Sequence, residues 1–162
     1  MTAEAVRRPG VWTRYLGVSL VPVAADRVAQ QPALLRALTD GFDRAAPPAM
    51  PDAEGEWFEI REGGETVGVA LVRRDCPKRR QASLLAVATA REARGRATST
   101  KTVLAAERKL RAEGYAPMFV RVPRTNGRGL YFMLRCGFTP VPADQRPDDP
   151  GDATWFARRV AA

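Results

Sequence analysis

The segment Ala82–Thr89 (ASLLAVAT) constrains the fold more than any other part of the chain, because it is apolar on both of its faces. A strand buried on both faces belongs in the centre of a sheet that is covered on each side. In proteins that mix the two kinds of element, helices form these covers. We therefore expect a central strand here, with helices packed against the sheet that contains it.

The other patterned segments place strands and helices around this strand. Helices are expected at Asp26–Arg44, where Pro32 splits the pattern or begins a second helix, at Thr98–Glu113, and at Asn126–Arg135. Further strands are expected at Val11–Val23 (interrupted near Gly17), Trp57–Arg61, Thr66–Val72, Pro117–Val122, Phe138–Val141 and Thr154–Val160. This order predicts a mixed α/β fold around one sheet, and we expect a single domain over residues 1–162.

Two features of the composition limit the chemistry. The chain has no histidine and only two cysteines, Cys76 and Cys136. It therefore lacks the residues for Ser-His-Asp or Cys-His catalysis, for a disulfide framework, and for an ordinary zinc site. No apolar run approaches the roughly 20 residues that span a bilayer, and the first residues lack the pattern of a signal peptide. We expect a cytoplasmic protein that binds no metal and no membrane.

Positive charge is concentrated in the middle of the chain. Residues 73–135 contain 16 basic and 4 acidic residues, a local charge of +12 in a chain whose net charge is +8. Such a segment is expected to bind an anion, either a phosphorylated cofactor or a nucleic acid. Nucleic acid is the less favoured partner, because the segment lacks a series of exposed aromatic residues on which bases stack.

The segment that follows the central strand has the form of an anion-binding loop. Residues 90–100 (AREARGRATST) lead from the strand into a helix through small and hydroxyl residues. The start of a helix has unpaired N–H groups and the positive end of the helix dipole, and both attract phosphate. Arg94 and Arg96 would add positive charge. The alternative is that Thr98, Ser99 or Thr100 only caps the helix.

The loop Arg94-Gly95-Arg96-Ala97-Thr98-Ser99, the segment from Glu107 to Gly114-Tyr115, and Asn126 followed by Cys136-Gly137-Phe138 are three motifs in chain order. Together they resemble the GNAT superfamily of acyl-CoA-dependent N-acyltransferases. The family signature Arg/Gln-x-x-Gly-x-Gly/Ala lies between the fourth strand and the third helix, and here it reads Arg94-Gly95-Arg96-Ala97-Thr98-Ser99, preceded by Glu92. The segment from Glu107 to Gly114-Tyr115 is similar to the usual end of that helix. Asn126 followed by Cys136-Gly137-Phe138 has the spacing of the family's Asn…Gly-Phe helix. The likeness covers about Trp57 to Val141.

The resemblance implies a mostly antiparallel sheet that splays between strands 4 and 5, with acetyl-CoA bound in the gap as a co-substrate. The pantetheine arm would pair with Val87, Ala88 and Thr89. The pyrophosphate would lie on the backbone amides of Arg94, Gly95, Arg96, Ala97, Thr98, Ser99 and Thr100, and Asn126 would contact the pantetheine.

The activity implied by the resemblance is transfer of the acetyl group to a primary amine of a small molecule or peptide. Two alternatives stay open. The first is a GNAT-fold protein that binds CoA or acyl-CoA but performs a different acyl transfer, runs another reaction, or only binds. The second is a nucleic-acid-binding module. The general acid, the general base and formation of a homodimer also stay open.

The chain departs from the family pattern at several positions. Ala97 and Ser99 replace two glycines, and either residue would be strained if its φ were positive. A family tyrosine that protonates the departing thiolate corresponds to Met133, which cannot donate a proton. Tyr131 lies two residues away, about 200° around a helix, so we expect it to face away from the thioester.

No acid lies on the central strand to serve as the family's general base. Glu59 is a conceivable substitute, although a solvent-facing position is the simpler expectation for it. The amine pocket is expected between the Asp26–Arg44 helices and the loops Asp75–Arg80 and Asp144–Asp152. Acids of the second loop would attract a cationic amine: Asp144, Asp148, Asp149 and Asp152. Cys136 is expected to be a small core residue, and Cys76 an incidental thiol.

Overall fold

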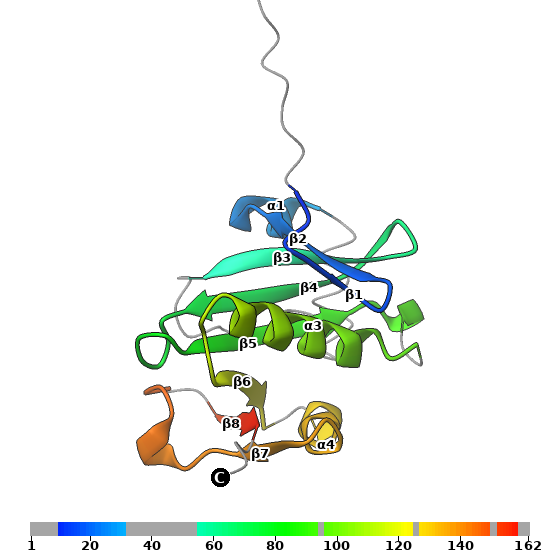
Figure 1. The fold of residues 1–162 in the computed structure, drawn as a ribbon. Coiled ribbons are helices and arrows are strands. Elements are labelled where there is room, and N and C mark those ends of the chain that lie inside the picture. The colour runs from blue at the N-terminus through cyan, green and yellow to red at the C-terminus, as the bar shows by residue number, and fades with distance from the viewer. Residues whose placement is uncertain (1–9, 32–54, 94–95, 125–126, 150–151, 159–162) are drawn as a thin grey trace, which may run out of the picture.

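The structure is a computed structural model, and it describes residues 10–31, 55–93, 96–124, 127–149 and 152–158. The strands are β1 (Thr13–Tyr15), β2 (Val18–Val23), β3 (Glu56–Glu62), β4 (Glu65–Arg74), β5 (Ala82–Thr89), β6 (Met118–Pro123), β7 (Phe138–Pro140) and β8 (Ala153–Arg158). The helices are α1 (Ala25–Gln30), α3 (Thr98–Ala112) and α4 (Gly127–Arg135), with short 3₁₀ turns at Arg91–Ala93 and Ala143–Gln145. Figure 1 shows their arrangement.

The eight strands of the described residues form one sheet in the order β1-β2-β3-β4-β5-β6-β8-β7. Neighbouring strands run antiparallel everywhere except between β5 and β6, which run parallel. The predicted mixed α/β fold with a mostly antiparallel sheet is therefore confirmed. The single strand expected over Val11–Val23 is two strands, separated by Leu16 and Gly17, which both have positive φ. The helix expected at Asp26–Arg44 is described only as far as Gln31.

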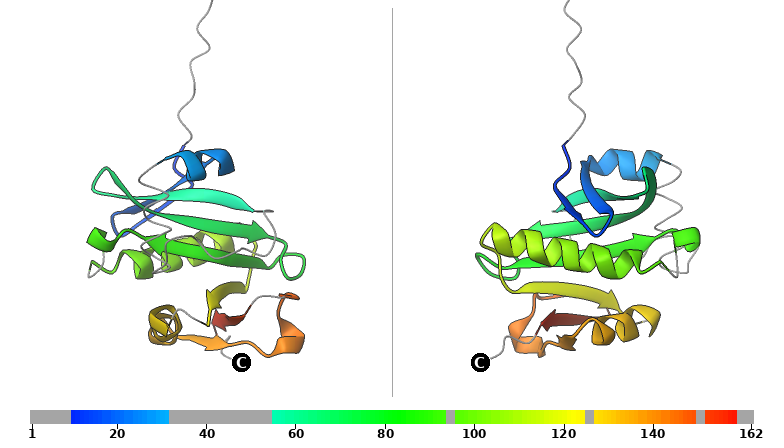
Figure 2. Two further views of the ribbon diagram at one scale, coloured as in Figure 1. Left: turned by 180° about the vertical axis from the view of Figure 1, so that it is seen from behind. Right: turned by 45° about the vertical axis from the view of Figure 1, so that its right-hand side comes forward.

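Helix α3 covers one face of the sheet. It lies in front of β4 and β5 in Figure 1 and behind these strands in the reverse view of Figure 2. Its apolar positions Val103, Ala106 and Leu110 recur every three or four residues, so they share one stripe of the helix. This stripe packs in the main core with residues that include Phe58 and Ile60. On the opposite face of the sheet, Val28 of α1 packs against Val69 and Ala88.

A bulge in β5 coincides with the place where β5 and β6 part. The two strands pair through only three positions, of which Leu84 opposite Val120 is the last. On the other side of β5, Val72 lies opposite Leu84 but Leu71 lies opposite Ala86, so Leu85 is an extra residue. A bulge bends its strand and increases the local twist. The second half of β5 therefore diverges from β6. These two strands correspond to strands 4 and 5 of the family, between which the splay was predicted.

No helix in the described ranges is long and apolar enough to cross a membrane.

Candidate functional site

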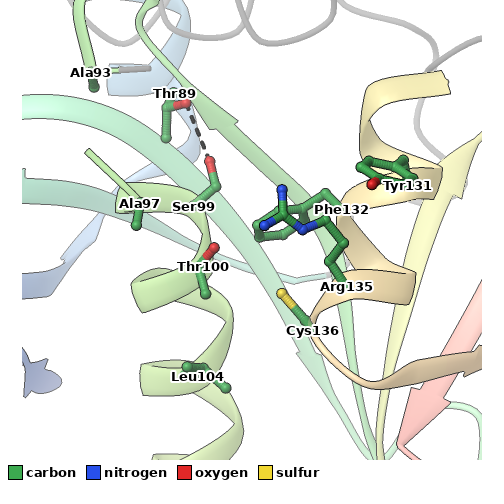
Figure 3. A pocket seen from close by; sticks show the side chains of 10 residues that line it. All are labelled: Thr89, Ala93, Ala97, Ser99, Thr100, Leu104, Tyr131, Phe132, Arg135 and Cys136. Carbon is green, nitrogen blue, oxygen red and sulfur yellow. Dashed lines mark hydrogen bonds between the residues drawn. The ribbon is translucent and has the colours of Figure 1, made fainter. Parts of the chain in front are cut away.

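A cavity of about 780 Å³ lies between the start of α3 and helix α4 (Figure 3). Its position follows from the splay, because it includes Thr89, the last residue of β5, beyond the point where β6 has separated. Its volume is in the ordinary range for small-molecule sites. The lining residues are Thr89, Ala93, Ala97, Ser99, Thr100, Leu104, Tyr131, Phe132, Arg135 and Cys136.

The first turn of α3 borders this cavity at Ser99 and Thr100, and it contains backbone N–H groups without a helical acceptor. The N–H of Lys101 is the first in α3 to reach a helical acceptor, the carbonyl oxygen of Ala97 at 3.0 Å. The N–H groups of Thr98, Ser99 and Thr100 precede it and have no partner within the helix. Together with the helix dipole, these groups favour an anion at this end.

The capping role considered for the hydroxyl residues is not observed. The residue at the N-cap position of α3 is Ala97, which has no side-chain cap hydrogen bond. The Thr98 hydroxyl donates instead to Glu62 Oε1 at 3.1 Å, and the Ser99 and Thr89 hydroxyl oxygens are hydrogen-bonded at 3.3 Å. Figure 3 shows this second bond among the residues that line the cavity.

Ala97 adopts the left-handed backbone conformation, with φ 56° and ψ 24°. The strain expected at this position is thus present, because a side chain with a Cβ pays about 1–2 kcal/mol there. The condition for strain is not met at Ser99, which does not have a positive φ and lies in the first turn of α3. Only the first of the two replaced glycines therefore falls where a glycine would be favoured.

Charged side chains surround the start of α3. Glu62, at the end of β3, lies 3.6 Å from Arg96 Nε through Oε1 and 3.6 Å from Lys101 Nζ through Oε2. Across the cavity, the Arg135 guanidinium lies 5.8 Å from the centre of the Tyr131 ring. Figure 3 shows Arg135 directed into the space between the two helices. Arg135 thus gives the α4 wall of the cavity a positive charge.

The edge of β5 that faces the splay is unpaired beyond Leu84 in the described ladders. Its other edge is fully used, since Val87, Ala88 and Thr89 pair with β4. Val87 packs toward the main core, and Ala88 lies on the opposite face with Val28. An extended chain could therefore pair with the free edge of this half-strand.

The predicted site residues divide into three groups. Thr89, Ala97, Ser99 and Thr100 line the cavity. Val87 and Ala88 lie on the adjoining half of β5, whereas Arg96 and Thr98 contact Glu62 beside the helix start. The remaining three, Arg94, Gly95 and Asn126, lie outside the described residues.

Sequence reasoning missed the wall of the cavity that α4 provides. The missed residues are Tyr131, Phe132, Arg135 and Cys136, together with Ala93 and Leu104. A signal was available, because positions 131, 132, 135 and 136 repeat at the spacing of one helix face.

Tyr131 and Met133 lie on opposite sides of α4, as their spacing predicts. Tyr131 is 64% exposed, whereas Met133 is 2% exposed and packs in the main core. The cavity borders the Tyr131 side of α4, so Tyr131 forms part of its wall, and the orientation of its hydroxyl relative to the thioester stays a prediction. Met133 does not line it.

The thiol of Cys136 lines the cavity instead of lying wholly within the core. Burial raises the pKa of Cys136, and a hydrogen bond with the Thr100 side chain only partly opposes this effect. The thiol therefore stays protonated near neutral pH, and a protonated thiol is a poor nucleophile.

Glu59 is buried, contrary to the solvent-facing position that was expected. It is 7% exposed and forms an ion pair with Arg61. Its neighbour across β4 is Val69, which in turn lies opposite Ala88 of β5. The carboxylate therefore lies two strands from the splayed half of β5. Because Phe58 and Ile60 face the main core beneath α3, Glu59 faces the other side of the sheet.

Two of the four acids expected to attract an amine are already paired. Asp149 Oδ2 accepts hydrogen bonds from Arg121 Nε at 2.7 Å and from Trp155 Nε1 at 3.0 Å, and its side chain is buried. Asp152 lies 3.3 Å from Arg124. Asp144 and Asp148 are exposed. The Asp75–Arg80 loop precedes β5, at the opposite end of that strand from Thr89, and does not border the cavity.

No group of three or more cysteine, aspartate or glutamate side chains among the described residues is arranged to hold a metal ion.

Similar proteins agree with this architecture. An acetyltransferase from Thermus thermophilus has 20% sequence identity and a TM-score of 0.66, with 90% of this chain and 99% of that chain covered. A GNAT family acetyltransferase from Elizabethkingia anophelis, solved with acetyl-CoA bound, has 14% identity and a TM-score of 0.60, covering 89% and 99%. The ribosomal-protein-S18-alanine N-acetyltransferase from Escherichia coli has 13% identity and a TM-score of 0.58, covering 90% and 96%. At such identities the likeness is one of fold.

No curated protein sequence matches this chain. The model of the acetyltransferase (GNAT) family, by contrast, matches residues 26–138, which are most of the sequence. The matched range includes the strand, loop and helix that form the cavity wall at Thr89, Ala97 and Thr100. The chain belongs to the acetyltransferase (GNAT) family.

Proposed function

We propose that this chain transfers an acetyl group from acetyl-CoA to a primary amine of a small molecule or a peptide. The observation that carries the proposal is the cavity between α3 and α4, which adjoins both the open start of a helix and the free edge of a splayed strand. Family membership supports the same reaction class. Of the similar proteins, one is solved with acetyl-CoA and another is named as a ribosomal-protein-S18-alanine N-acetyltransferase.

The residues present fit the chemical groups of acetyl-CoA. The pyrophosphate would accept hydrogen bonds from the N–H groups of Thr98, Ser99 and Thr100, with Arg135 adding positive charge from α4. The amide-containing pantetheine arm would pair with the free edge of β5 at Val87–Thr89. The thioester end of acetyl-CoA would then lie in the gap between the second half of β5 and β6.

The reaction itself needs little covalent chemistry from the protein. The amine nitrogen would attack the thioester carbonyl carbon, a C–N bond would form, and the C–S bond would break. The amine would lose one proton, and the sulfur would leave as a thiolate and then be protonated. A thiol has a pKa near 8.5, so departure requires only modest help. Positioning the two reactants together therefore provides much of the rate.

Glu59 is a candidate to receive the amine's proton. It is buried on the face of the sheet opposite α3, two strands from Ala88, a separation that one water molecule and the glutamate side chain can bridge. Among the described residues Arg61 contacts Oε1 of Glu59, so Oε2 would be the oxygen that accepts the proton.

The first test is binding. Acetyl-CoA or CoA at 100 times its Kd should stabilise the fold by about 2.7 kcal/mol and raise the unfolding midpoint by about 5–10 °C. No shift at millimolar CoA would contradict the proposal and favour a nucleic-acid partner instead.

The second test is turnover with acetyl-CoA and a panel of primary amines, measured as release of free CoA thiol and as acetylated product by mass spectrometry. Product formation with at least one amine is expected. If CoA binds but none is acetylated, the alternative of another acyl transfer, or of binding alone, replaces the proposal. The burial of Met133 at the position of the family tyrosine, with no acid on β5, is the observation that favours this alternative.

A further inference from the structure

The hairpin between β3 and β4 places one carboxylate, that of Glu62, against the start of α3. Its Oε1 accepts a hydrogen bond from the Thr98 hydroxyl at 3.1 Å and lies 3.6 Å from Arg96 Nε. Its Oε2 lies 3.6 Å from Lys101 Nζ. The Glu62 side chain is mostly buried, so these contacts are shielded from water more than ordinary surface ion pairs. One side chain of the sheet thus holds three residues of the helix start.

These three contacts lie on both sides of Ala97 along the chain. Arg96 directly precedes Ala97, and its Nη2 also donates to the carbonyl oxygen of Glu92 at 3.4 Å. Thr98 directly follows Ala97, and Lys101 donates its N–H to the Ala97 carbonyl oxygen. A residue in an unfavourable backbone region persists only when its surroundings over-determine it. Ala97, with φ 56°, is such a residue.

We propose that Glu62 is a positioning residue for the acetyl-CoA site: its carboxylate holds Ala97 in the left-handed conformation and so keeps the Thr98, Ser99 and Thr100 N–H groups directed at the pyrophosphate. The inference rests on the proposed function, because it assigns the pyrophosphate to this helix start. A chain with glycine at position 97 would adopt the turn without a Cβ penalty. In this chain the clamp formed by Glu62 takes over that role.

A purely electrostatic view of Glu62 predicts the opposite effect on binding. The carboxylate is an anion close to the phosphate position, and it competes for Arg96 and Lys101. If charge alone mattered, removing the carboxylate would free two cations and strengthen binding of CoA. If the clamp matters, removal reduces the fraction of molecules whose helix start is ready to bind, and the apparent Kd rises in proportion.

The test measures the Kd of CoA by titration calorimetry for wild type, Glu62→Gln, Ala97→Gly and the double variant. Glu65→Gln is the matched control, since Glu65 lies opposite Glu62 in the same hairpin, is exposed, and has no side-chain hydrogen bond or ion pair with the described residues. We expect Glu62→Gln to raise the Kd about tenfold and Glu65→Gln to change it less than about twofold. In the Ala97→Gly background, Glu62→Gln should raise the Kd less than about threefold, because glycine no longer needs the clamp.

Tighter or unchanged binding in Glu62→Gln would overturn the inference, as would an equal loss in the alanine and glycine backgrounds. Glu62→Asp provides a second variant, which keeps the charge but shortens the side chain. The clamp predicts weaker binding for it, whereas charge alone predicts no change. Once an acetylated amine is known, Glu62→Gln should raise KM for acetyl-CoA and leave kcat within about twofold. Failure of wild type to bind CoA would contradict the proposed function itself, so the two failures are distinguishable.

Discussion

The two ends of α3 are built on different principles. At the C-terminal end, Tyr115 N–H reaches the Leu110 carbonyl oxygen at 2.8 Å and Gly114 N–H reaches the Arg111 carbonyl oxygen at 3.0 Å. These two bonds, with Gly114 at φ 94°, form a Schellman motif that pairs the last carbonyl groups. At the N-terminal end, alanine occupies the left-handed position and three N–H groups have no helical acceptor.

A glutamate contacts each end of α3, Glu62 at the N-terminal end and Glu113 at the C-terminal end, but only the N-terminal end adjoins the cavity. At the C-terminal end, Glu113 accepts hydrogen bonds from Trp12 Nε1 at 3.1 Å and from Arg74 Nη2 at 2.9 Å. At the N-terminal end, Ser99 and Thr100 border a cavity. At the C-terminal end the backbone groups are paired and a glycine occupies the left-handed position. At the N-terminal end, where the ligand is proposed to bind, N–H groups lack a helical acceptor and an alanine occupies that position. This is the expected signature of a functional site.

The largest effect is expected from a negative charge at the N-terminal end of α3, called the open end because its first N–H groups have no helical acceptor. Ser99→Glu should weaken CoA binding about 100-fold, because a carboxylate beside the proposed pyrophosphate position repels it. The same carboxylate at the start of a helix should leave thermal stability unchanged or slightly raised. Calorimetric titration and thermal unfolding measure the two effects. Ser99→Gln is the neutral control, and an equal loss in that variant would show that size, not charge, is responsible.

A smaller effect is expected at the C-terminal end of α3, called the closed end because the Schellman motif pairs its last carbonyl groups. Gly114→Ala should lower the free energy of unfolding by about 1 kcal/mol, since a Cβ there meets no atom within 4 Å and only the left-handed backbone is penalised. CoA affinity should not change. Denaturant unfolding and titration test this separation of stability from binding. A parallel loss of CoA affinity would mean that the two ends are coupled.

Acid should weaken the closed end. Burial tends to raise the pKa of Glu113, but hydrogen bonds from Arg74 and Trp12 outweigh it and lower the pKa below its ordinary 4.5. A group whose pKa is lowered by folding stabilises the fold above its unfolded pKa and loses that contribution as the pH falls through the folded pKa. Wild type should therefore lose more stability than Glu113→Gln as the pH falls below about 4.5, by about 0.5 kcal/mol for this partly exposed pair. Unfolding curves across this pH range measure the difference, with Glu65→Gln as a control. An equal loss of unfolding free energy in wild type and Glu113→Gln would contradict the account.

The smallest effect is expected from the Tyr131 hydroxyl. Tyr131 lines the cavity with its ring but is largely exposed, on the side of α4 opposite Met133. We expect that Tyr131 is not the proton donor, so Tyr131→Phe should change kcat less than about threefold. Loss of a true general acid would lower kcat by about 10²–10⁴-fold. A loss of two or more decades in turnover, with CoA binding intact, would identify Tyr131 as the proton donor.

The sequence predicted the strand and helix that carry the site better than the side chains that line the cavity. The strand at Ala82–Thr89 and the helix from Thr98 were predicted with nearly the observed bounds, because each has an uninterrupted apolar pattern. Helical spacing also separated Tyr131 from Met133. It could not say which of them faces the cavity, because that depends on how α4 packs beside β6 and β7.

Burial of charged residues was the other limit. The alternation around Glu59 is that of a half-exposed strand, and only the sheet's covered second face buries this carboxylate. Asp149 is paired with Arg121, which lies 28 residues away in the sequence. The local sequence predicts neither the burial of Glu59 nor the pairing of Asp149, because both depend on tertiary structure.

Amide hydrogen exchange along α3, with and without saturating CoA, tests the central claim most directly. If the pyrophosphate binds the open end, CoA should slow exchange of the Thr98, Ser99 and Thr100 amides by at least about tenfold beyond any change at Gly114 and Tyr115. The already bonded amides at the closed end should shift only with global stability. Equal slowing at both ends, or no slowing at residues 98–100 while CoA is bound, would contradict the account.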